Sequence, residues 1–258
     1  MNLVASVRRA VFDVQMRRTS RTDEPELALV PALCPAGQVF LDVGANRGVY
    51  AWVARRAGAR VIAIEPHPAM AAQLRRAFGP AIDVRELALS DGAGVVTLHV
   101  PRHRGRPLTS RSSLDLGANP GLALTAVEVE RARLDDLDLP ALGMIKIDVE
   151  GHELAAVRGA QARLAQDRPP VMIEVEERHH AGAIAAMRAL MSEAGYDGHF
   201  LDLGRLRPIG EFDLAVHQRR EHAVAPRAGR APGTIYINNF VFLHRADRAV
   251  RERLRAWL

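Results

Sequence analysis

Cysteine is almost absent from this sequence of 258 residues, in which Cys34 is the single copy. One cysteine excludes an intrachain disulfide and any metal site built from a cysteine cluster. Aromatic residues make up only 5% of the chain, which argues against a nucleic-acid surface of basic residues interleaved with exposed aromatic rings. No apolar run approaches the roughly 20 residues that a membrane-spanning helix needs. We therefore expect a cytoplasmic protein with no membrane span and no nucleic-acid partner.

Lysine is equally scarce, because Lys146 is the only lysine among 35 basic residues. We attribute the arginine bias to genomic composition. The formal net charge of +5 is modest for this length, so it permits an acidic partner without requiring one. The hydrophobic content of 48% and the charged content of 25% are ordinary for a globular protein. A chain of this length suits one α/β domain with a small addition.

Residues 1–37 contain no functional motif, and we interpret them as an N-terminal helical extension of a main domain at residues 38–258. Four valines recur there at spacings of three and four, which predicts one face of a helix: Val4, Val7, Val11 and Val14. Arginines interrupt the apolar stretches, so the segment lacks the continuous core of a signal peptide. We expect this helix to pack on the domain, with a basic helix on a membrane surface as the alternative.

From residue 39 onward, short apolar runs alternate with helical patterns, which is typical of βαβ units around a parallel sheet. The expected strands of this sheet are residues 39–43, 61–64, 82–86, 144–148 and 171–175. The expected helices are residues 50–57, 68–78, 152–164 and 183–194. Further strands are expected at residues 95–100, 127–129, 199–203 and 235–243. The Arg/Gly/Pro-rich residues 218–233 predict a mobile loop.

A glycine turn follows the first expected strand, in the run Leu-Asp-Val-Gly-Ala-Asn-Arg-Gly that ends at Gly48. The middle glycine of a dinucleotide-binding turn is missing, and so is the Gly-Lys-Ser/Thr of a phosphate-binding loop. The remaining pattern is acid-x-Gly-x-x-x-Gly, which starts at Asp42 and suits a cofactor without a pyrophosphate. Gly44 lets the backbone approach a ligand closely, and the start of the next helix offers unpaired N–H groups.

Glu65 closes the second expected strand in the run Ile-Glu-Pro-His-Pro. An acid in this position can accept hydrogen bonds from both hydroxyls of a ribose. Each feature alone is weak evidence, since glycine turns occur in many folds and a glutamate at a strand end is often only a cap. Their combination in β-turn-α-β order favours a nucleoside cofactor.

A third feature is the run Ile-Lys-Ile-Asp-Val-Glu-Gly-His-Glu, which ends at Glu153. Its ionisable side chains fall at or just after the C-terminal end of a central strand, where open α/β sheets bind ligands. Glu150 and Glu153 have a structural alternative, because acids stabilise the N-terminus of a helix through its dipole. Asp148 is the stronger functional candidate, since a buried strand end rarely carries an unpaired carboxylate.

Together these runs resemble the FkbM-type S-adenosylmethionine-dependent methyltransferases. The runs at residues 86–91, 112–114 and 134–137 extend the resemblance over about residues 38–203, and the run Lys146–Glu153 is its most specific part. The resemblance implies an α/β fold of the class I methyltransferase type, which is Rossmann-like. In that fold a seven-stranded, mostly parallel sheet has its last strand antiparallel and helices on both faces.

The resemblance also implies that S-adenosyl-L-methionine lies across the ends of the first four strands. The residues that would frame its methionine part are Asp42, Gly44, Asn46 and Gly48. Glu65 would hold the ribose, with His67 nearby. The residues that would flank the adenine are Ala88, Leu89 and Asp91. His67 stands where we would expect asparagine, and its alternative role is to cap the following helix.

The reaction implied by the resemblance is O-methylation by a transferase whose acceptor is a hydroxyl of a sugar, a glycolipid or a secondary metabolite. Methyl transfer is an in-line displacement, so positioning of the acceptor oxygen supplies much of the acceleration. The hydroxyl must also lose its proton, which a general base or a metal can assist. The candidate bases are Asp148, Glu150 and His152.

Asp148 and Glu174 end neighbouring strands and are therefore candidate ligands of Mg²⁺, similar to the acids of catechol-type O-methyltransferases. The structural alternative is that Glu174 and Glu176 line the pocket or pair with arginines. Other functions remain open: an RNA or protein methyltransferase, or a noncatalytic module that binds S-adenosylmethionine. A base methylase is disfavoured, because no Asn/Asp-Pro-Pro-aromatic signature follows the fourth strand.

Overall fold

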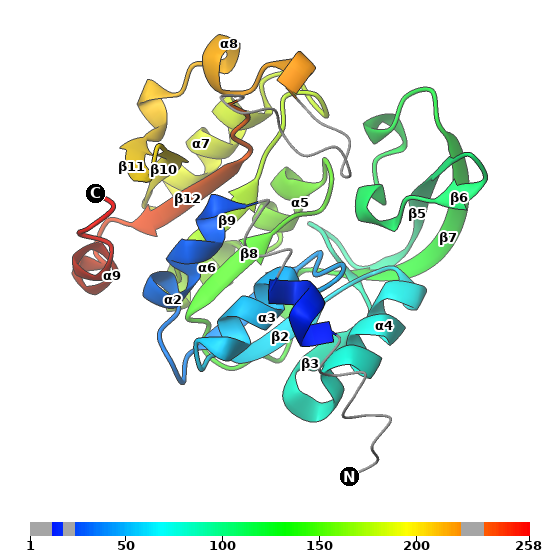
Figure 1. Cartoon of the computed structure of the whole chain (residues 1–258), viewed down its shortest axis with the longest axis horizontal. Helices are drawn as coiled ribbons and strands as arrows, with labels where there is room; N and C mark the ends of the chain where they lie inside the picture. Colours follow the sequence, from blue (N-terminus) through cyan, green and yellow to red (C-terminus); the bar gives the residue numbers. More distant parts are fainter. Residues whose placement is uncertain (1–11, 18–23, 223–234) are drawn as a thin grey trace.

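The computed structural model describes residues 12–17, 24–222 and 235–258. Within them, an eight-stranded sheet with the order β11-β10-β12-β9-β8-β1-β2-β3 runs through the centre of the molecule (Figure 1). Its parallel strands are β1 (Val39–Val43), β2 (Arg60–Ile64), β3 (Asp83–Arg85), β8 (Met144–Ile147) and β9 (Val171–Glu174). The last strand in the chain, β12 (Asn239–His244), is antiparallel to both β9 and β10 (Tyr196–Asp202). The expected α/β fold with an antiparallel last strand is confirmed.

The sheet has one strand more than the seven expected. The additional strand is β11 (Arg205–Pro208), which pairs antiparallel with β10 at the edge of the sheet. A two-residue turn joins the two strands, and both of its residues have a positive φ, 46° at Leu203 and 80° at Gly204. Such turns match the natural twist of a hairpin. The expected strand at residues 199–203 therefore ends one residue earlier and turns back.

Helices cover both faces of the sheet, and alternate residues of each strand face opposite sides. One core contains Phe40, Met144 and Met172 with α2 (Val30–Leu33), α3 (Val49–Arg56), α4 (Pro68–Phe78) and α9 (Arg248–Arg253). The opposite core contains Leu41, Ile145 and Ile173 with α5 (Glu153–Arg158), α6 (Gln161–Asp167) and α7 (Ala183–Glu193). Burial on both faces explains why the parallel strands β1, β2, β8 and β9 are mostly apolar runs, whereas the edge strand β3 is not.

The helix expected at residues 152–164 is divided into α5 and α6, so the prediction of one continuous helix was wrong. A Cβ atom on Gly159 would lie only 1.9 Å from the carbonyl oxygen of Ser90, so the two backbones are in direct contact. Asp135 then caps α6, because its carboxylate accepts hydrogen bonds from the backbone N–H groups of Ala162 (3.2 Å) and Arg163 (2.9 Å). Contacts with segments distant in sequence therefore interrupt the helix.

A second sheet is inserted between β3 and β8 and stands beside the main sheet (Figure 1). This inserted sheet contains β4 (Ala88–Leu89), β5 (Gly94–His103), β6 (Arg106–Pro107) and β7 (Ala123–Ala132). The strands β5 and β7 form a long antiparallel pair, so the two additional strands expected here are confirmed and are longer than expected. The remaining short elements are η1 (Pro25–Leu29), η2 (Gly79–Ala81), η3 (Thr109–Arg111), η4 (Leu116–Ala118), η5 (Leu134–Asp136), η6 (Ile209–Glu211), α8 (Leu214–His217) and η7 (Arg220–His222).

The described part of the expected N-terminal helix, residues 12–17, packs on α3 and α4. The Phe12 and Phe78 rings meet edge to face with their centroids 5.0 Å apart, and the Trp52 indole N–H donates to Asp13 over 2.8 Å. Met16 is buried, whereas Val14 is 51% exposed. The described part of the helix therefore packs through Phe12 and Met16 and leaves Val14 outward.

The other three valines of that face, and residues 223–233 of the expected loop, lie outside the described residues. Among the described helices, none is long and apolar enough to cross a membrane.

Candidate functional site

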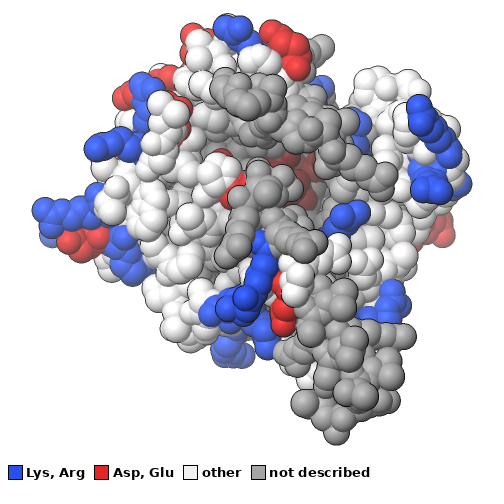
Figure 2. Space-filling view, viewed as in Figure 1, with Lys and Arg blue, Asp and Glu red and all other residues white. Residues whose placement is uncertain are grey.

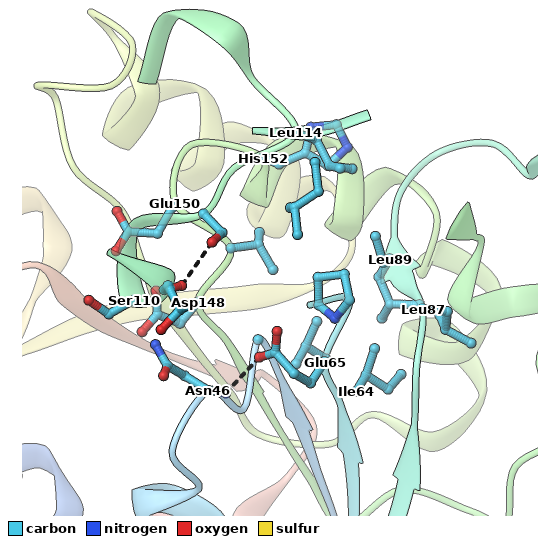
Figure 3. Close-up of a pocket in the computed structure, with 18 residues that line it drawn as sticks. Asn46, Ile64, Glu65, Leu87, Leu89, Ser110, Leu114, Asp148, Glu150 and His152 are labelled. Carbon is cyan, nitrogen blue, oxygen red and sulfur yellow. Dashed lines mark hydrogen bonds between the residues drawn. The ribbon is translucent and has the colours of Figure 1, made fainter. Parts of the chain in front are cut away.

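A pocket lies where the strands β1, β2 and β8 end, and the inserted sheet forms its opposite wall (Figure 3). The space between its walls measures about 570 Å³, part of which is open to solvent. The space-filling view shows acidic side chains in the hollow at the centre of this face, whereas Lys and Arg lie mainly at the periphery (Figure 2). The pocket is thus at the sheet edge where the sequence predicted a ligand.

Glu65 is the best-defined polar group in the cofactor half of the pocket. Its Oε2 accepts a hydrogen bond from the Asn46 backbone N–H (2.8 Å), and its Oε1 accepts one from the His67 backbone N–H (2.9 Å). The side chain is buried, and this burial raises the pKa of Glu65 to about 7. Two acceptor sites are used by the protein, and a carboxylate offers about four. Glu65 therefore retains acceptor capacity for two hydroxyl groups.

The two glycines of the turn are required by packing as well as by backbone conformation. Gly44 has φ +77°, and a Cβ atom there would lie 1.8 Å from the carbonyl oxygen of Asp148. Gly48 has φ +78°, and its Cβ atom would lie 2.7 Å from Phe78 and 2.8 Å from Leu74. Gly44 lines the pocket and Gly48 does not. The glycines let the turn after β1 fit against the end of β8 and against α4.

Among the other predicted cofactor residues, Asn46, Ala88 and Leu89 line the pocket, and three do not. Asp42 is buried and accepts a hydrogen bond from the Ala51 backbone N–H (3.0 Å), so it supports the start of α3. Burial raises the pKa of Asp42 to about 7.

His67 and Asp91 are the other two predicted cofactor residues that do not line the pocket. The Nδ1 atom of His67 accepts from the Ala69 backbone N–H (3.2 Å), which is the capping geometry of the alternative interpretation. Asp91 accepts a hydrogen bond from the Ser90 hydroxyl (3.3 Å). Both side chains therefore stabilise local structure next to the pocket.

The three candidate bases, Asp148, Glu150 and His152, all line the pocket (Figure 3). The loop that carries them is held in an unusual conformation, since Glu150 has φ +50°, which costs a residue with a side chain about 1–3 kcal/mol. Glu153 secures this loop, because its Oε1 accepts from the backbone N–H groups of Val149 (3.3 Å) and Gly151 (3.0 Å). Glu153 therefore has the structural role that the sequence left open.

Glu150 contacts two basic side chains that the sequence did not connect with it. Its Oε2 lies 3.4 Å from Nη2 of Arg178 and 3.4 Å from Nε2 of His179. Burial and the charge of Asp148 raise the pKa of Glu150 to about 8, although Arg178 opposes this shift. Burial and the Arg178 charge lower the pKa of His179 to about 4. Glu150 therefore titrates close to neutral pH beside a neutral imidazole.

His152 is held on the side of the pocket formed by the inserted sheet, next to Leu114 (Figure 3). Its Nε2 lies 3.0 Å from the Ser90 hydroxyl. Burial lowers the pKa of His152, although the charge of Asp91 opposes this shift. The candidate bases are thus divided between two sides of the pocket, with His152 apart from the carboxylates.

The predicted magnesium site is not supported. Among the described residues, no three or more His, Cys, Asp or Glu side chains form a group that could hold a metal ion. Glu174 does not line the pocket and accepts a hydrogen bond from the Asn238 side-chain amide (2.8 Å). The positive charge near both predicted ligands belongs to Lys146, whose Nζ lies 3.9 Å from Oδ2 of Asp148 and whose charge acts on Glu174.

Sequence reasoning missed the opposite wall of the pocket, which β5 and the segment between β6 and β7 supply: Leu98, Thr109, Ser110, Ser112 and Leu114. The run at residues 112–114 belonged to the family resemblance, but it indicated no role. The sequence contained even less indication of Arg178 and His179. Only the suggestion that Glu176 pairs with an arginine concerned this segment.

Residues 42–197 match the model of the methyltransferase FkbM domain family. No curated protein sequence matches the chain. One similar solved structure is a methyltransferase FkbM from Methylobacillus flagellatus, with 17% identity, coverage of 80% of this chain and 43% of that chain, and a TM-score of 0.49. This chain thus spans less than half of that relative.

Two other similar structures are also methyltransferases. A TehB-like SAM-dependent methyltransferase from Corynebacterium glutamicum is 13% identical, with 90% of this chain and 97% of that chain covered and a TM-score of 0.46. A precorrin-6y C5,15-methyltransferase from Geobacter metallireducens is 12% identical, with 84% and 87% covered and a TM-score of 0.44.

Proposed function

The chain belongs to the methyltransferase FkbM domain family, and from this premise we propose that it is an S-adenosylmethionine-dependent O-methyltransferase. Its acceptor is a hydroxyl of a small molecule of the sugar, glycolipid or secondary-metabolite class. One observation carries the proposal: Glu65 lines the same pocket as Asp148 and Glu150. A group suited to holding a ribose is thus combined with carboxylates suited to a reacting hydroxyl.

Three observations support a fit to the cofactor, which supplies an activated methyl group when it is bound. Glu65 retains acceptor capacity for the two ribose hydroxyls. The side-chain Oδ1 of Asn46 is buried and has no hydrogen-bond partner among the described residues, so it lacks a donor such as the cofactor's ammonium group. Ala88 and Leu89 offer apolar surface for the adenine.

Asp148 and Glu150 provide the chemistry at the acceptor. The Asp148 side chain is 34% exposed, and its Oδ2 faces Lys146, which leaves Oδ1 to accept a hydrogen bond from the acceptor hydroxyl. The Glu150 carboxyl has a pKa of about 8, which suits a group that removes a proton near neutral pH. Asp148 therefore orients the hydroxyl, and Glu150 accepts its proton in the basic form.

The test is a transfer assay with methyl-labelled S-adenosylmethionine and a panel of methyl glycosides, glycolipids and hydroxylated metabolites. We expect label on a hydroxyl oxygen of one compound class. A short RNA and an unstructured peptide belong in the same panel, because label in either would contradict the proposal and favour the corresponding alternative. Calorimetric binding of the cofactor without transfer to any compound would identify a noncatalytic binding module.

A further inference from the structure

The only lysine of the chain lies in its core. Lys146 is the last but one residue of β8, and its side chain is 1% exposed. Its neighbours Ile145 and Ile147 pack into the core of α5–α7, so Lys146 points to the opposite face, toward α3. An ammonium group is costly to remove from water unless opposite charges compensate it. Such a group at a strand end next to the pocket therefore calls for an explanation.

The surroundings of Lys146 keep its ammonium group charged. Its Nζ donates to the Ile147 carbonyl oxygen (3.3 Å), lies 3.9 Å from Oδ2 of Asp148 and lies 5.0 Å from the centroid of the Tyr50 ring. Burial lowers the pKa of Lys146, but nearby carboxylates outweigh this effect and raise it overall. The carboxylates that do so are Asp148, Glu174, Glu24 and Asp42.

The residue type is informative because the other 34 basic residues are all arginine. Lysine carries a compact ammonium group, whereas the guanidinium of arginine is a wider planar fork. The space at Lys146 is limited by the Tyr50 ring on one side and by the packed sheet on the other. A compositional bias that selects arginine elsewhere has therefore not replaced the lysine at this position.

We propose that Lys146 is a positioning residue whose ammonium group holds the Asp148 carboxylate at the pocket, in the place where a divalent cation was expected. The proposal rests on the proposed function of the pocket. Of the two predicted metal ligands, Asp148 lies 3.9 Å from this positive charge, which also acts on Glu174. A divalent cation between them would be repelled by it. Because the ammonium lies toward Oδ2, the other carboxylate oxygen stays available to the acceptor hydroxyl.

The test is a double-mutant cycle of Lys146→Met and Asp148→Asn, with turnover measured on the panel compound that the parent methylates fastest. Methionine keeps the length and apolar character of the lysine stem and removes the charge. We expect Lys146→Met to lower kcat by about 100-fold, as for loss of a group that supports acid–base chemistry, with KM little changed. In the Asp148→Asn background the same substitution should cost less than about threefold, since residues that act together are not additive.

A matched control is Arg163→Met, which removes a mostly buried cation in α6 that lies 3.4 Å from Asp167. It should leave kcat unchanged. Calorimetric affinity for S-adenosylmethionine should stay within about threefold in Lys146→Met, because Glu65 and Asn46 do not contact Lys146. Retained turnover in Lys146→Met, an equal loss in both backgrounds, or loss of cofactor binding would each overturn the proposal.

Two further measurements do not depend on an acceptor. In a Mn²⁺ titration followed by electron paramagnetic resonance, the parent protein should bind no ion; a bound Mn²⁺ that Asp148→Asn removes would overturn the proposal. The same cycle measured by urea unfolding should show coupling between Lys146 and Asp148, and additive losses would overturn it. If the parent methylates no compound of the panel, the proposed function fails, while the unfolding cycle still decides whether Lys146 holds Asp148.

Discussion

Oε2 of Glu150 and Nε2 of His179 lie 3.4 Å apart, and both side chains are largely buried, at 16% and 5% exposure. Burial acts on the two groups in opposite directions, because it disfavours the charged form of each. It raises the pKa of Glu150 to about 8 and lowers that of His179 to about 4. At pH 7 both groups are therefore mainly neutral, and Glu150 gains its negative charge as the pH rises toward 8.

The first prediction follows for the pH dependence of turnover. If Glu150 accepts the acceptor's proton, kcat should rise through about pH 8, and Glu150→Gln should lower kcat and remove this step. The measurement is a kcat profile from pH 6 to 9 at saturating cofactor. Glu211→Gln is the control, because Glu211 is an exposed acid paired with Arg207. A step that persists in Glu150→Gln would assign the titration to another group.

The second prediction concerns Asp148. Replacement by asparagine keeps the shape of the side chain and removes its charge, so turnover should fall by about 10²- to 10⁴-fold. Affinity for S-adenosylmethionine, measured by calorimetry, should change little because Asn46 and Glu65 follow other strands, β1 and β2. Treatment of the parent enzyme with a chelator should leave its turnover unchanged, since Lys146 supplies the positive charge at this position. Activity that disappears with chelator and returns with Mg²⁺ would contradict this assignment.

The third prediction concerns Glu65. Glu65→Gln should weaken binding of S-adenosylmethionine, because glutamine has one acceptor oxygen where the carboxylate has two. Loss of a hydrogen bond to a charged group costs about 1.5–3 kcal/mol, which is roughly a 10- to 150-fold change in Kd. Calorimetry with S-adenosylhomocysteine measures the effect without turnover. Glu86→Gln is the control, since Glu86 pairs with Arg75 on the surface; equal affinities in both variants would remove Glu65 from the cofactor site.

The fourth prediction concerns stability as a function of pH. Burial raises the pKa values of Asp42, Glu65 and Glu153 to about 7 and that of Glu150 to about 8. In this range these four groups bind more protons in the folded protein than in the unfolded chain. The free energy that they contribute to stability is therefore fully present below their ordinary pKa values and is lost as the pH rises through 7 to 8. We expect the Tm of the cofactor-free protein to fall between pH 6.5 and 8.

The lowered pKa of His179 acts in the opposite direction, and its effect on the slope fades within about one pH unit above the ordinary histidine value of 6.5. The control is Glu153→Gln, which retains an oxygen for the N–H groups of Val149 and Gly151 but does not titrate. Its Tm should fall less steeply over the same range. Scanning calorimetry at several pH values gives both slopes, and a Tm that rises from pH 6.5 to 8 would contradict the burial argument.

The fifth prediction compares two glycines of similar backbone conformation. Gly44 has φ +77° and a Cβ position 1.8 Å from the Asp148 carbonyl oxygen, whereas Gly37 has φ +84° and no neighbour within 4 Å. Gly37→Ala should lower the free energy of unfolding by about 1–2 kcal/mol, which is the cost of a side chain in left-handed backbone. Gly44→Ala adds an overpacking cost of about 1–3 kcal/mol. Urea unfolding measures the difference, and equal losses would show that the turn relaxes away from β8.

Local patterns in the sequence were sufficient for the main sheet. The central parallel strands are buried on both faces, so they form short apolar runs such as residues 39–43, and the helices between these runs require the strands to be parallel. Parallel strands end at the same edge of the sheet. The meeting of Glu65, Asp148 and Glu150 in one pocket could therefore be predicted from their positions at strand ends.

Which groups these side chains meet was decided only by the tertiary structure. Arg178 is 28 positions from Glu150, and the wall at residues 109–114 comes from the segment between β6 and β7 of the inserted sheet. The tertiary structure also decided that the expected helix is interrupted at Gly159. It likewise placed the ammonium group of Lys146 where a metal ion was expected. Periodicity reports which face of an element is apolar, but contacts between distant segments depend on how the faces pack. Burial, and with it the pKa of each acid, is likewise a property of the packed structure.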